Sequence, residues 1–264
     1  MQPLLEVKKL TMDFGGLRAI DSVDFNIYEK EIVALIGPNG AGKTTFFNCI
    51  TGIYNPTAGD IFLYTKKGHK KRLNGLKPNK VTELGLARTF QNIRLFKGMT
   101  VLENVMIGRH CRTHANIFAA LIRNKKIIKE EFESAVYSYH ILERLGLEKF
   151  ANEIAENLPY GEQRKLEIAR ALATEPKILL LDEPAAGLNP QETENLIKIV
   201  KMLRDEDGIS VLLIEHDMGM VMKISERITV MDYGEKIAEG TPKEIKENPE
   251  VIKAYLGEEI DVEA

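Results

Sequence analysis

Cysteine is scarce in this sequence, whose 264 residues include only two, Cys49 and Cys111. These two stand in no spacing typical of a disulfide framework or a metal site, and so low a content is usual in a reducing compartment. Long apolar runs are missing as well, because no stretch approaches the roughly 20 residues that a membrane-spanning helix needs. The N-terminus lacks the charged-then-apolar form of a signal peptide. We therefore expect a cytoplasmic protein, which could still dock on a membrane protein.

An excess of positive charge is also missing. The formal net charge is -3 at pH 7, which argues against a nucleic-acid-binding protein that relies on bulk positive charge. Apolar residues, in contrast, are plentiful, at 44% of the chain. A chain of this length and composition can bury a core in one large domain or in two closely associated lobes.

A glycine-rich segment that follows an apolar run carries the strongest functional signal. Ile32–Ile36 is typical of a buried parallel strand, and Phe46–Ile50 is apolar enough to begin a helix. Between them lies G-x-x-x-x-G-K-[ST], the pattern of a phosphate-binding loop. The loop consists of Gly37, Pro38, Asn39, Gly40, Ala41, Gly42, Lys43, Thr44 and Thr45. A plain glycine-rich turn would match the same letters, but the flanking strand and helix favour nucleotide binding.

The residue types in this loop suit a polyphosphate. Glycines let successive backbone N–H groups turn inward around the phosphates, and the helix start adds unpaired N–H groups and a positive dipole end. We expect Lys43 to reach the β- and γ-phosphates and Thr44 to offer its hydroxyl to Mg²⁺. The sequence therefore predicts a nucleotide-binding protein.

A second apolar run, Ile178–Leu181, ends in two acids, Asp182 and Glu183. The run is typical of a strand buried on both faces, and its end is where a P-loop sheet holds Mg²⁺ and the γ-phosphate. Asp182 fits the acid on the metal side, and Glu183 fits the base or polarising group for an attacking water. The acids could instead cap a helix, since Pro184 follows, but the P-loop favours the catalytic interpretation.

The periodicity of the chain predicts an α/β fold. Residues 4–27 alternate between apolar and polar, which indicates half-buried antiparallel strands. Residues 101–147 have a helical pattern. Further on, strand-like runs alternate with helical ones, at 178–181, 191–204, 210–214, 218–225 and 228–231. Such alternation indicates a mostly parallel sheet wrapped by helices.

Two segments allow a functional and a plain interpretation. The basic run Lys66–Arg72 could contact nucleic acid, but no aromatic residues interleave with its lysines and arginines, which favours a solvated hairpin tip. Cys111–Lys126 mixes basic with apolar residues and could form an amphipathic helix at a membrane surface. Packing against neighbouring helices is the more common use of such a helix.

Further motifs follow in an order that is found in one family. They are Phe14, Arg88–Gln91, Leu158–Gln163, Ala186–Pro190 and Ile214–Asp217. With the P-loop and the acid pair, they make the chain similar over nearly its whole length to the nucleotide-binding subunit of an ATP-binding cassette (ABC) transporter. The resemblance implies an α/β P-loop NTPase cassette with a RecA-like core, an antiparallel β subdomain and a helical subdomain.

The resemblance also implies how a single ATP-binding domain, residues 1–264, is divided. The catalytic core with its β subdomain would comprise 1–90 and 160–240, the helical subdomain 91–159, and a C-terminal extension 241–264.

The resemblance assigns roles to individual residues. Each residue taken by itself would not suggest such a role. Phe14, otherwise a core aromatic, would stack on adenine. Gln91, otherwise a loop amide, would sense Mg²⁺ and water, and His216, otherwise a strand-end histidine, would contact the γ-phosphate. The implied catalytic set is Glu183, His216 and Gln91, and the implied Mg²⁺ ligands are Thr44, Gln91 and Asp182.

The signature segment departs from the family's usual Leu-Ser-Gly-Gly-Gln. Pro159 has neither a hydroxyl nor an N–H group, and Tyr160 replaces the first glycine. Gly161 remains at the start of a helix, whose N–H groups and dipole can still meet the γ-phosphate held by another subunit. Asn189 likewise stands where the family usually has Asp. We expect closure over ATP to survive, with fewer side-chain contacts from this half.

The Leu-Pro-Tyr-Gly signature resembles one branch, the ATP-binding subunits of importers for leucine, isoleucine and valine. The motifs Phe14–Leu17 and Arg88–Phe96, the insert 109–129 and the ending 248–257 fit this branch too. It implies a homo- or heterodimer with a second ABC ATPase, two transmembrane permeases, an indirectly associated external binding protein, no nucleic acid, and a place on the inner face of the cell membrane. The alternatives are a urea or amide importer ATPase and a soluble ABC ATPase without a transport role.

Overall fold

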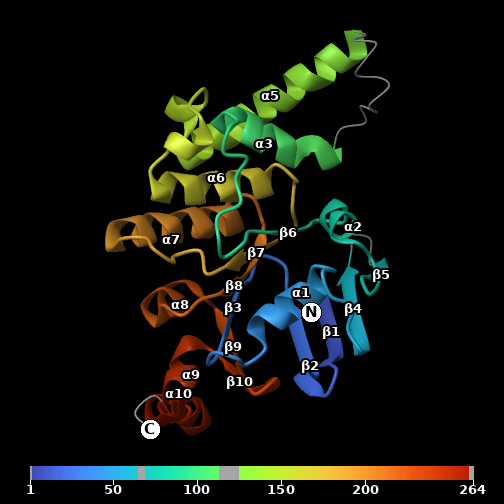
Figure 1. The fold of residues 1–264 in the computed structure, drawn as a ribbon, viewed down its shortest axis with the longest axis vertical. Coiled ribbons are helices and arrows are strands. Elements are labelled where there is room, and N and C mark those ends of the chain that lie inside the picture. The colour runs from blue at the N-terminus through green and yellow to red at the C-terminus, as the bar shows by residue number, and fades with distance from the viewer. Residues whose placement is uncertain (1, 65–68, 113–124, 262–264) are drawn as a thin grey trace.

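The computed structural model describes residues 2–64, 69–112 and 125–261 of the chain. Some helices gather at one end of the molecule and others lie at the opposite end beside the C-terminus, with a central sheet between them and a second sheet beside helix α1 (Figure 1). The helices are α1 Lys43–Ile50, α2 Pro78–Glu83, α3 Val101–Arg109, α5 Lys125–Leu145, α6 Tyr160–Leu172, α7 Pro190–Asp205, α8 Met218–Ile224, α9 Pro242–Glu247 and α10 Pro249–Asp261. The basic run and the amphipathic segment considered above fall partly at 65–68 and 113–124, outside the described residues.

The N-terminal part of the chain forms a four-stranded sheet of order β2-β1-β4-β5. Its strands are β1 Leu5–Phe14, β2 Leu17–Ile27, β4 Ala58–Tyr64 and β5 Lys70–Arg72. They pair antiparallel, with Leu5 opposite Ile27 in β2 and opposite Leu63 in β4. Most apolar residues of β1 and β2 turn to the buried face, whereas Phe14 and Leu17 at the hairpin tip are exposed and a register shift interrupts the alternation between Val7 and Leu10. The prediction of half-buried antiparallel strands is confirmed.

The central sheet has six strands in the order β10-β9-β3-β8-β7-β6. They are β3 Ile32–Ile36, β6 Leu86–Arg88, β7 Ile178–Asp182, β8 Ser210–Ile214, β9 Arg227–Asp232 and β10 Glu235–Gly240. Five run parallel, and only β10 pairs antiparallel, at the edge. The predicted, mostly parallel sheet is confirmed, although periodicity did not reveal β6 or β10. Because parallel strands share an orientation, the segments that follow β3, β7 and β8 leave the same edge.

Two apolar cores cover the two faces of this sheet. On one face, side chains of the sheet pack with helices α3 and α5 to α8. On the other face, they pack with α1 and the antiparallel sheet. Every residue of β3, β7 and β8 is therefore buried, which explains why these strands are continuous apolar runs. Among the residues described, no helix combines the length and apolar character needed to cross a bilayer.

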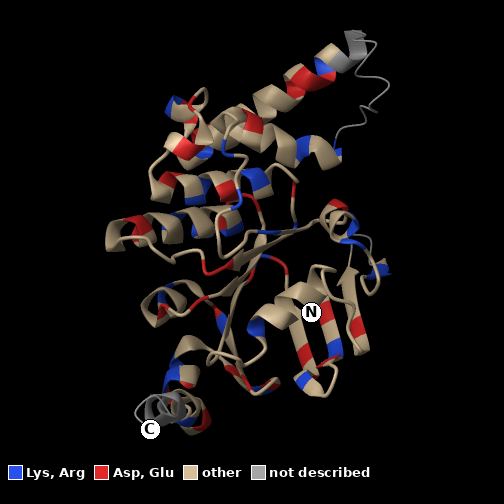
Figure 2. Ribbon diagram, in the orientation of Figure 1, with Lys and Arg blue, Asp and Glu red and all other residues tan. Residues whose placement is uncertain are grey.

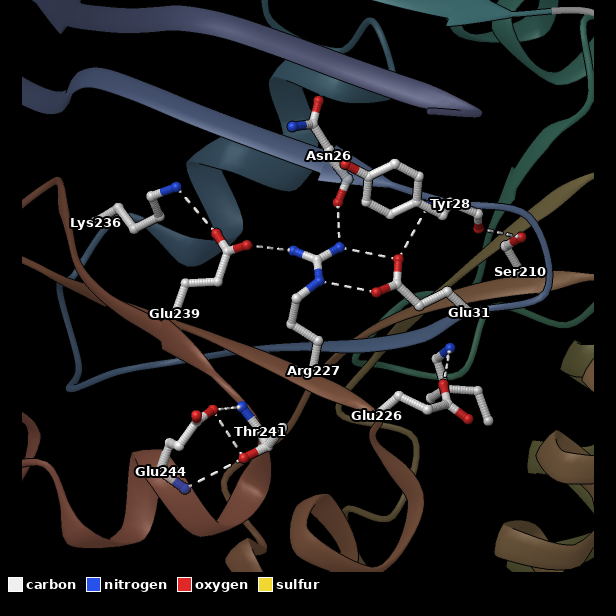
Figure 3. Close-up of polar contacts among 11 residues, drawn as sticks. Asn26, Tyr28, Glu31, Ser210, Glu226, Arg227, Lys236, Glu239, Thr241 and Glu244 are labelled. Carbon is white, nitrogen blue, oxygen red and sulfur yellow. Dashed lines mark hydrogen bonds and ion pairs between the residues drawn. The ribbon is translucent and has the colours of Figure 1, made fainter. Parts of the chain in front are cut away.

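A charged network joins the two sheets near the start of β3 (Figure 3). Arg227, the first residue of β9, binds Glu31 through Nε at 2.8 Å and Glu239 of β10 through Nη1 at 2.8 Å. Its Nη2 donates to the backbone oxygen of Asn26 in β2 at 2.7 Å. The guanidinium thus bonds to both sheets at once, in a fork geometry that Lys could not reproduce.

Candidate functional site

The phosphate-binding loop lies between β3 and α1, as predicted. Gly37, Gly40 and Gly42 adopt φ values of 150°, 78° and 96°, in the region that favours glycine. A Cβ on Gly37 would lie 2.0 Å from the backbone oxygen of Met231, and one on Gly42 would lie 2.5 Å from that of Ala19. Glycine is therefore required by close packing as well as by conformation. No side chain caps the start of α1, and the N–H groups at a helix start attract anions.

Lys43 reaches back across this loop. Its Nζ donates to the backbone oxygens of Gly37 and Pro38, both at 2.6 Å. The side chain is buried, so the ammonium group lies inside the loop, where a polyphosphate would carry its charge. Thr44, in contrast, is exposed at the start of α1.

A cleft of about 630 Å³ borders the loop. Asn39 and Gly40 line one side of it, and Glu250 and Lys253 of α10 line the other. The C-terminal helix thus forms one wall of the space beside the phosphate-binding loop.

Asp182, the last residue of β7, is held by Arg88. The two side chains are 6% and 8% exposed, and Arg88 Nη2 lies 2.6 Å from Asp182 Oδ2. The same guanidinium donates through Nη1 to Asn48 Oδ1 of α1 at 2.6 Å. Arg88 belongs to a motif of the sequence, but its contact with Asp182 could not be predicted, because the contact depends on β6 and β7 being neighbours in the sheet.

Glu183 meets two other predicted residues. Its Oε2 accepts from Gln91 Nε2 at 2.8 Å, and its Oε1 lies 3.1 Å from His216 Nε2. The backbone of Glu183 has a φ of 47°, a value that is uncommon outside glycine and that starts a turn at the end of β7. The structure therefore brings together Gln91, Glu183 and His216, which are far apart in the sequence.

Glu215 supports this cluster and was missed by sequence analysis. Its carboxylate is buried and accepts from the backbone N–H groups of Ala185, His216 and Asp217 at 2.7, 3.1 and 3.4 Å. Burial raises the pKa of Glu215, and the three N–H groups act against that shift. It ties the loop after β7 to the loop after β8. Glu215 directly follows the apolar run of β8, as Asp182 follows the apolar run within β7, and this position was the signal that could have revealed it.

Two predicted residues lie apart from this cluster. Phe14 is exposed at the tip of the β1–β2 hairpin and makes an edge-on contact with Tyr54, with ring centroids 5.3 Å apart. Gly161 lies in the first turn of α6. A Cβ on Gly161 would come within 2.5 Å of Oε1 of Glu192 in α7, so a larger residue there would displace the end of that side chain.

The donor set proposed for Mg²⁺ consists of oxygens: the Thr44 hydroxyl, the Gln91 amide and the Asp182 carboxylate. Such hard ligands suit Mg²⁺, which keeps several waters and binds through one or two carboxylates plus substrate phosphates. Across 2–64, 69–112 and 125–261, no group of three or more His, Cys, Asp or Glu side chains could hold a metal by itself. The residues fit an ion that arrives with the nucleotide.

A P-loop after β3, an acid pair at the end of β7, which is separated from β3 by β8, and the layered α/β architecture define an ATP-binding cassette. The family model described as "ABC transporter" matches residues 20–186, and one described as "Branched-chain amino acid ATP-binding cassette transporter" matches residues 235–261. The chain belongs to the ABC transporter family, as an ATP-binding subunit whose ATPase activity is coupled to transport.

Sequence relatives agree with this assignment. The chain is 50% identical to the high-affinity branched-chain amino acid transport ATP-binding protein BraF of Pseudomonas aeruginosa, over 97% of this chain and 99% of the relative. It is 49% identical to the corresponding protein LivG of Escherichia coli, over the same shares of the two chains.

Solved structures agree on the fold. A nucleotide-free ATP-binding cassette from an ABC transporter has a TM-score of 0.82 at 31% identity and covers 96% of this chain and 99% of its own. The ADP conformation of the cassette MJ1267 has a TM-score of 0.82 at 30% identity, over 97% and 100%. The predicted cassette fold and the predicted family are confirmed.

Proposed function

We propose that this chain hydrolyses ATP to drive the uptake of leucine, isoleucine and valine through partner permeases. The observation that carries the chemistry is the contact of Glu183 with both Gln91 and His216, one residue beyond the buried Asp182. The substrate class rests on relatives named as branched-chain amino acid transport proteins and on the C-terminal match at 235–261.

The phosphates of ATP bind in the loop Gly37–Thr45, and adenine stacks on Phe14. Lys43 exchanges its two backbone oxygens for phosphate oxygens and thus keeps its charge compensated. The exposed ring of Phe14 and its edge contact with Tyr54 support a stacking surface, because an aromatic ring offers its face to a base.

Thr44, Gln91 and Asp182 would hold Mg²⁺, which when bound neutralises charge on the β- and γ-phosphate oxygens. Arg88 orients the carboxylate of Asp182 before any metal arrives. Glu183 then accepts a proton from the attacking water, and Gln91 and His216 hold the Glu183 carboxylate in place until the substrate is bound.

The partners of this chain are a second ABC ATPase, identical or different, two membrane permeases, and an external binding protein that acts through them. A neighbour of similar fold, MJ0796, has been solved as a dimer; its TM-score is 0.73 at 28% identity, over 90% of this chain and 98% of that one. In our chain, the start of α6 with Gly161 closes on ATP held by the partner. The permeases contact the helical subdomain, residues 91–159, which places the chain at the inner face of the membrane. Positive and negative residues are interspersed along α5, α6 and α7 (Figure 2), which does not suit a polyanion.

The test is uptake in the host organism after deletion of this chain. We expect the loss of ATP-dependent uptake of radiolabelled leucine, isoleucine and valine, restored by the wild-type chain and by the control Glu29→Gln, an exposed acid outside the helical subdomain, but not by Glu183→Gln. A loss of urea uptake with unchanged leucine uptake would indicate an amide importer. Unchanged uptake, with the chain sedimenting with ribosomes or DNA, would contradict a transport role.

A further inference from the structure

A buried ion pair in α6 has no part in the mechanism above. Arg164 Nη1 lies 3.1 Å from Glu167 Oε2, and both side chains are 1% exposed. Burial raises the pKa of Glu167, while the charge of Arg164 opposes that rise. An ion pair of this kind seldom increases stability over an apolar pair of the same size, because both charges lose their hydration. The role of the Arg164–Glu167 pair is therefore better inferred from its other hydrogen bonds than from a gain in stability.

The Arg164–Glu167 pair forms hydrogen bonds with the backbone around Gln91. Arg164 donates to the backbone oxygen of Phe90 through Nη1 and to that of Gln91 through Nη2, both at 2.9 Å. Glu167 Oε1 accepts from the N–H groups of Phe90 at 3.3 Å and Arg94 at 3.4 Å. Two charged side chains of α6 thus bind four backbone groups of a single loop. The side chain of Gln91, at the same residue, is bonded to Glu183.

Tyr160 extends this network to the loop that follows Glu183. Arg164 Nη2 also donates to the Tyr160 hydroxyl at 3.2 Å, and that hydroxyl donates to the backbone oxygen of Ala186 at 3.0 Å. The ring lies against Gly187, where an added Cβ would come within 3.1 Å of it. The phenol stands at the position where the family pattern has a glycine, which could make none of these contacts.

We propose that Tyr160 and Arg164 are positioning residues that couple the start of α6 to Gln91 and to the loop after Glu183. Nucleotide in this chain's own P-loop displaces Gln91 or Glu183 from their mutual contact, and the backbone groups held by Arg164 and Tyr160 move with them. Separating a buried guanidinium from its acceptors is costly, so α6 follows. The first turn of α6 contains Gly161 and contacts the ATP that the partner subunit binds. One site of the dimer thereby reports its state to the other, an inference that rests on the proposed function.

Amide hydrogen exchange of the full chain tests this coupling. The protein is compared with and without Mg²⁺ and a non-hydrolysable ATP analogue, at a concentration where light scattering reports a monomer. In the wild type, we expect the analogue to slow exchange in the loop 37–45 and to change exchange at residues 158–166 by about fivefold, the effect of one ordinary hydrogen bond. In Tyr160→Phe, which keeps the Arg164 contacts with Phe90 and Gln91, the response at 37–45 stays and the response at 158–166 is reduced.

Two further variants sharpen the result. Tyr139→Phe removes the same hydroxyl from an exposed tyrosine of α5 and should respond like the wild type. Arg164→Lys keeps the charge beside Glu167 but cannot form the fork to Phe90 and Gln91, and should lose the response at 158–166. Should Arg164→Lys fail to fold, Tyr160→Phe, a nearly isosteric change at an exposed residue, still decides the question. A purely structural role would alter exchange equally with and without the analogue.

An undiminished response at 158–166 in both Tyr160→Phe and Arg164→Lys would overturn the coupling, as would a wild-type response confined to residues 37–45. Absence of any protection at 37–45 in the wild type would overturn nucleotide binding itself and, with it, both the proposed function and the coupling.

Discussion

Asp182 and Glu183 are adjacent acids at the end of one strand, yet their surroundings differ. Asp182 is buried and bound to a guanidinium, which is itself anchored to α1 through Asn48. Glu183 is 20% exposed, and its partners are an amide and an imidazole. A left-handed backbone at Glu183 sends the chain into a turn and separates the two environments.

This difference separates a fixed acid from an adjustable one. Asp182 could leave Arg88 only by stranding a buried charge. Glu183 can exchange the amide and imidazole contacts for water and phosphate at small cost, since exposed hydrogen bonds are readily replaced by solvent. A rigid acid suits a permanent metal-side position, and an adjustable one suits a group that must accept and release a proton in every cycle.

The largest expected effect comes from the adjustable acid. Glu183→Gln should lower ATP turnover by about 10²- to 10⁴-fold, the usual contribution of a general base, while ATP binding and the unfolding midpoint stay close to wild type. ATP-bound dimers should accumulate, measured by phosphate release and by size-exclusion chromatography with ATP. Undiminished turnover would remove Glu183 from the role of base.

Loss of the cation that holds Asp182, the fixed acid, should lower the free energy of unfolding. Arg88→Met leaves the carboxylate of Asp182 buried without its cation, which should cost about 3–5 kcal/mol of unfolding free energy, measured by urea denaturation. Arg72→Met breaks an exposed pair with Asp60 and should cost less than about 1 kcal/mol. Equal losses in the two variants would show that burial of the Arg88 pair has no energetic consequence.

A smaller change should follow from removing one partner of Glu183. Gln91→Ala removes a group that positions Glu183, so turnover should fall by about 10- to 100-fold, as misplacement of a catalytic group does. Gln91 is exposed, so the melting temperature should hardly move. Gln191→Ala, at the exposed start of α7, is the matched control. A large loss of stability with unchanged turnover would reassign Gln91 to a structural role.

The smallest effect concerns pH. Because burial raises the folded-state pKa of Glu215 above its ordinary value of 4.5, the folded chain binds more protons there than the unfolded chain. That contribution to stability is present in full below pH 4.5 and is lost as the pH rises through the folded-state pKa. The stability gap between wild type and Glu215→Gln should therefore widen as the pH is lowered from 7 towards 4.5. Urea denaturation at several pH values measures it, and a gap that narrows on acidification would mean a lowered pKa.

Local patterns were sufficient to predict much of this molecule. The apolar runs of β3 and β7 are buried on both faces, so their sequences are distinctive, and the P-loop glycines follow directly from the backbone they must adopt. The alternation of β1 and β2 revealed the second sheet. Gln91 and His216 were predicted only through the family resemblance, since nothing local distinguishes a loop amide or a histidine after a strand.

The supporting contacts could not be predicted, because they join elements that are distant in sequence. Arg88 meets Asp182 only when β6 pairs with β7, and Arg164 meets Phe90 only when α6 packs on the loop after β6. Tyr160 was noted as a departure from the family pattern, yet its partner Ala186 follows a turn whose direction depends on the unusual φ of Glu183. Residue type alone predicts none of these pairings.

The lysine of the phosphate loop has a consequence for how quickly the site can be used. Lys43 closes the loop on itself through Gly37 and Pro38, so the chain needs no nucleotide to organise it. Binding is then an exchange of oxygen ligands around one ammonium group, and the entropy of ordering the loop was already lost when the protein folded. Release restores the same internal ligands. The empty site is therefore ready for the next ATP as soon as the last product leaves.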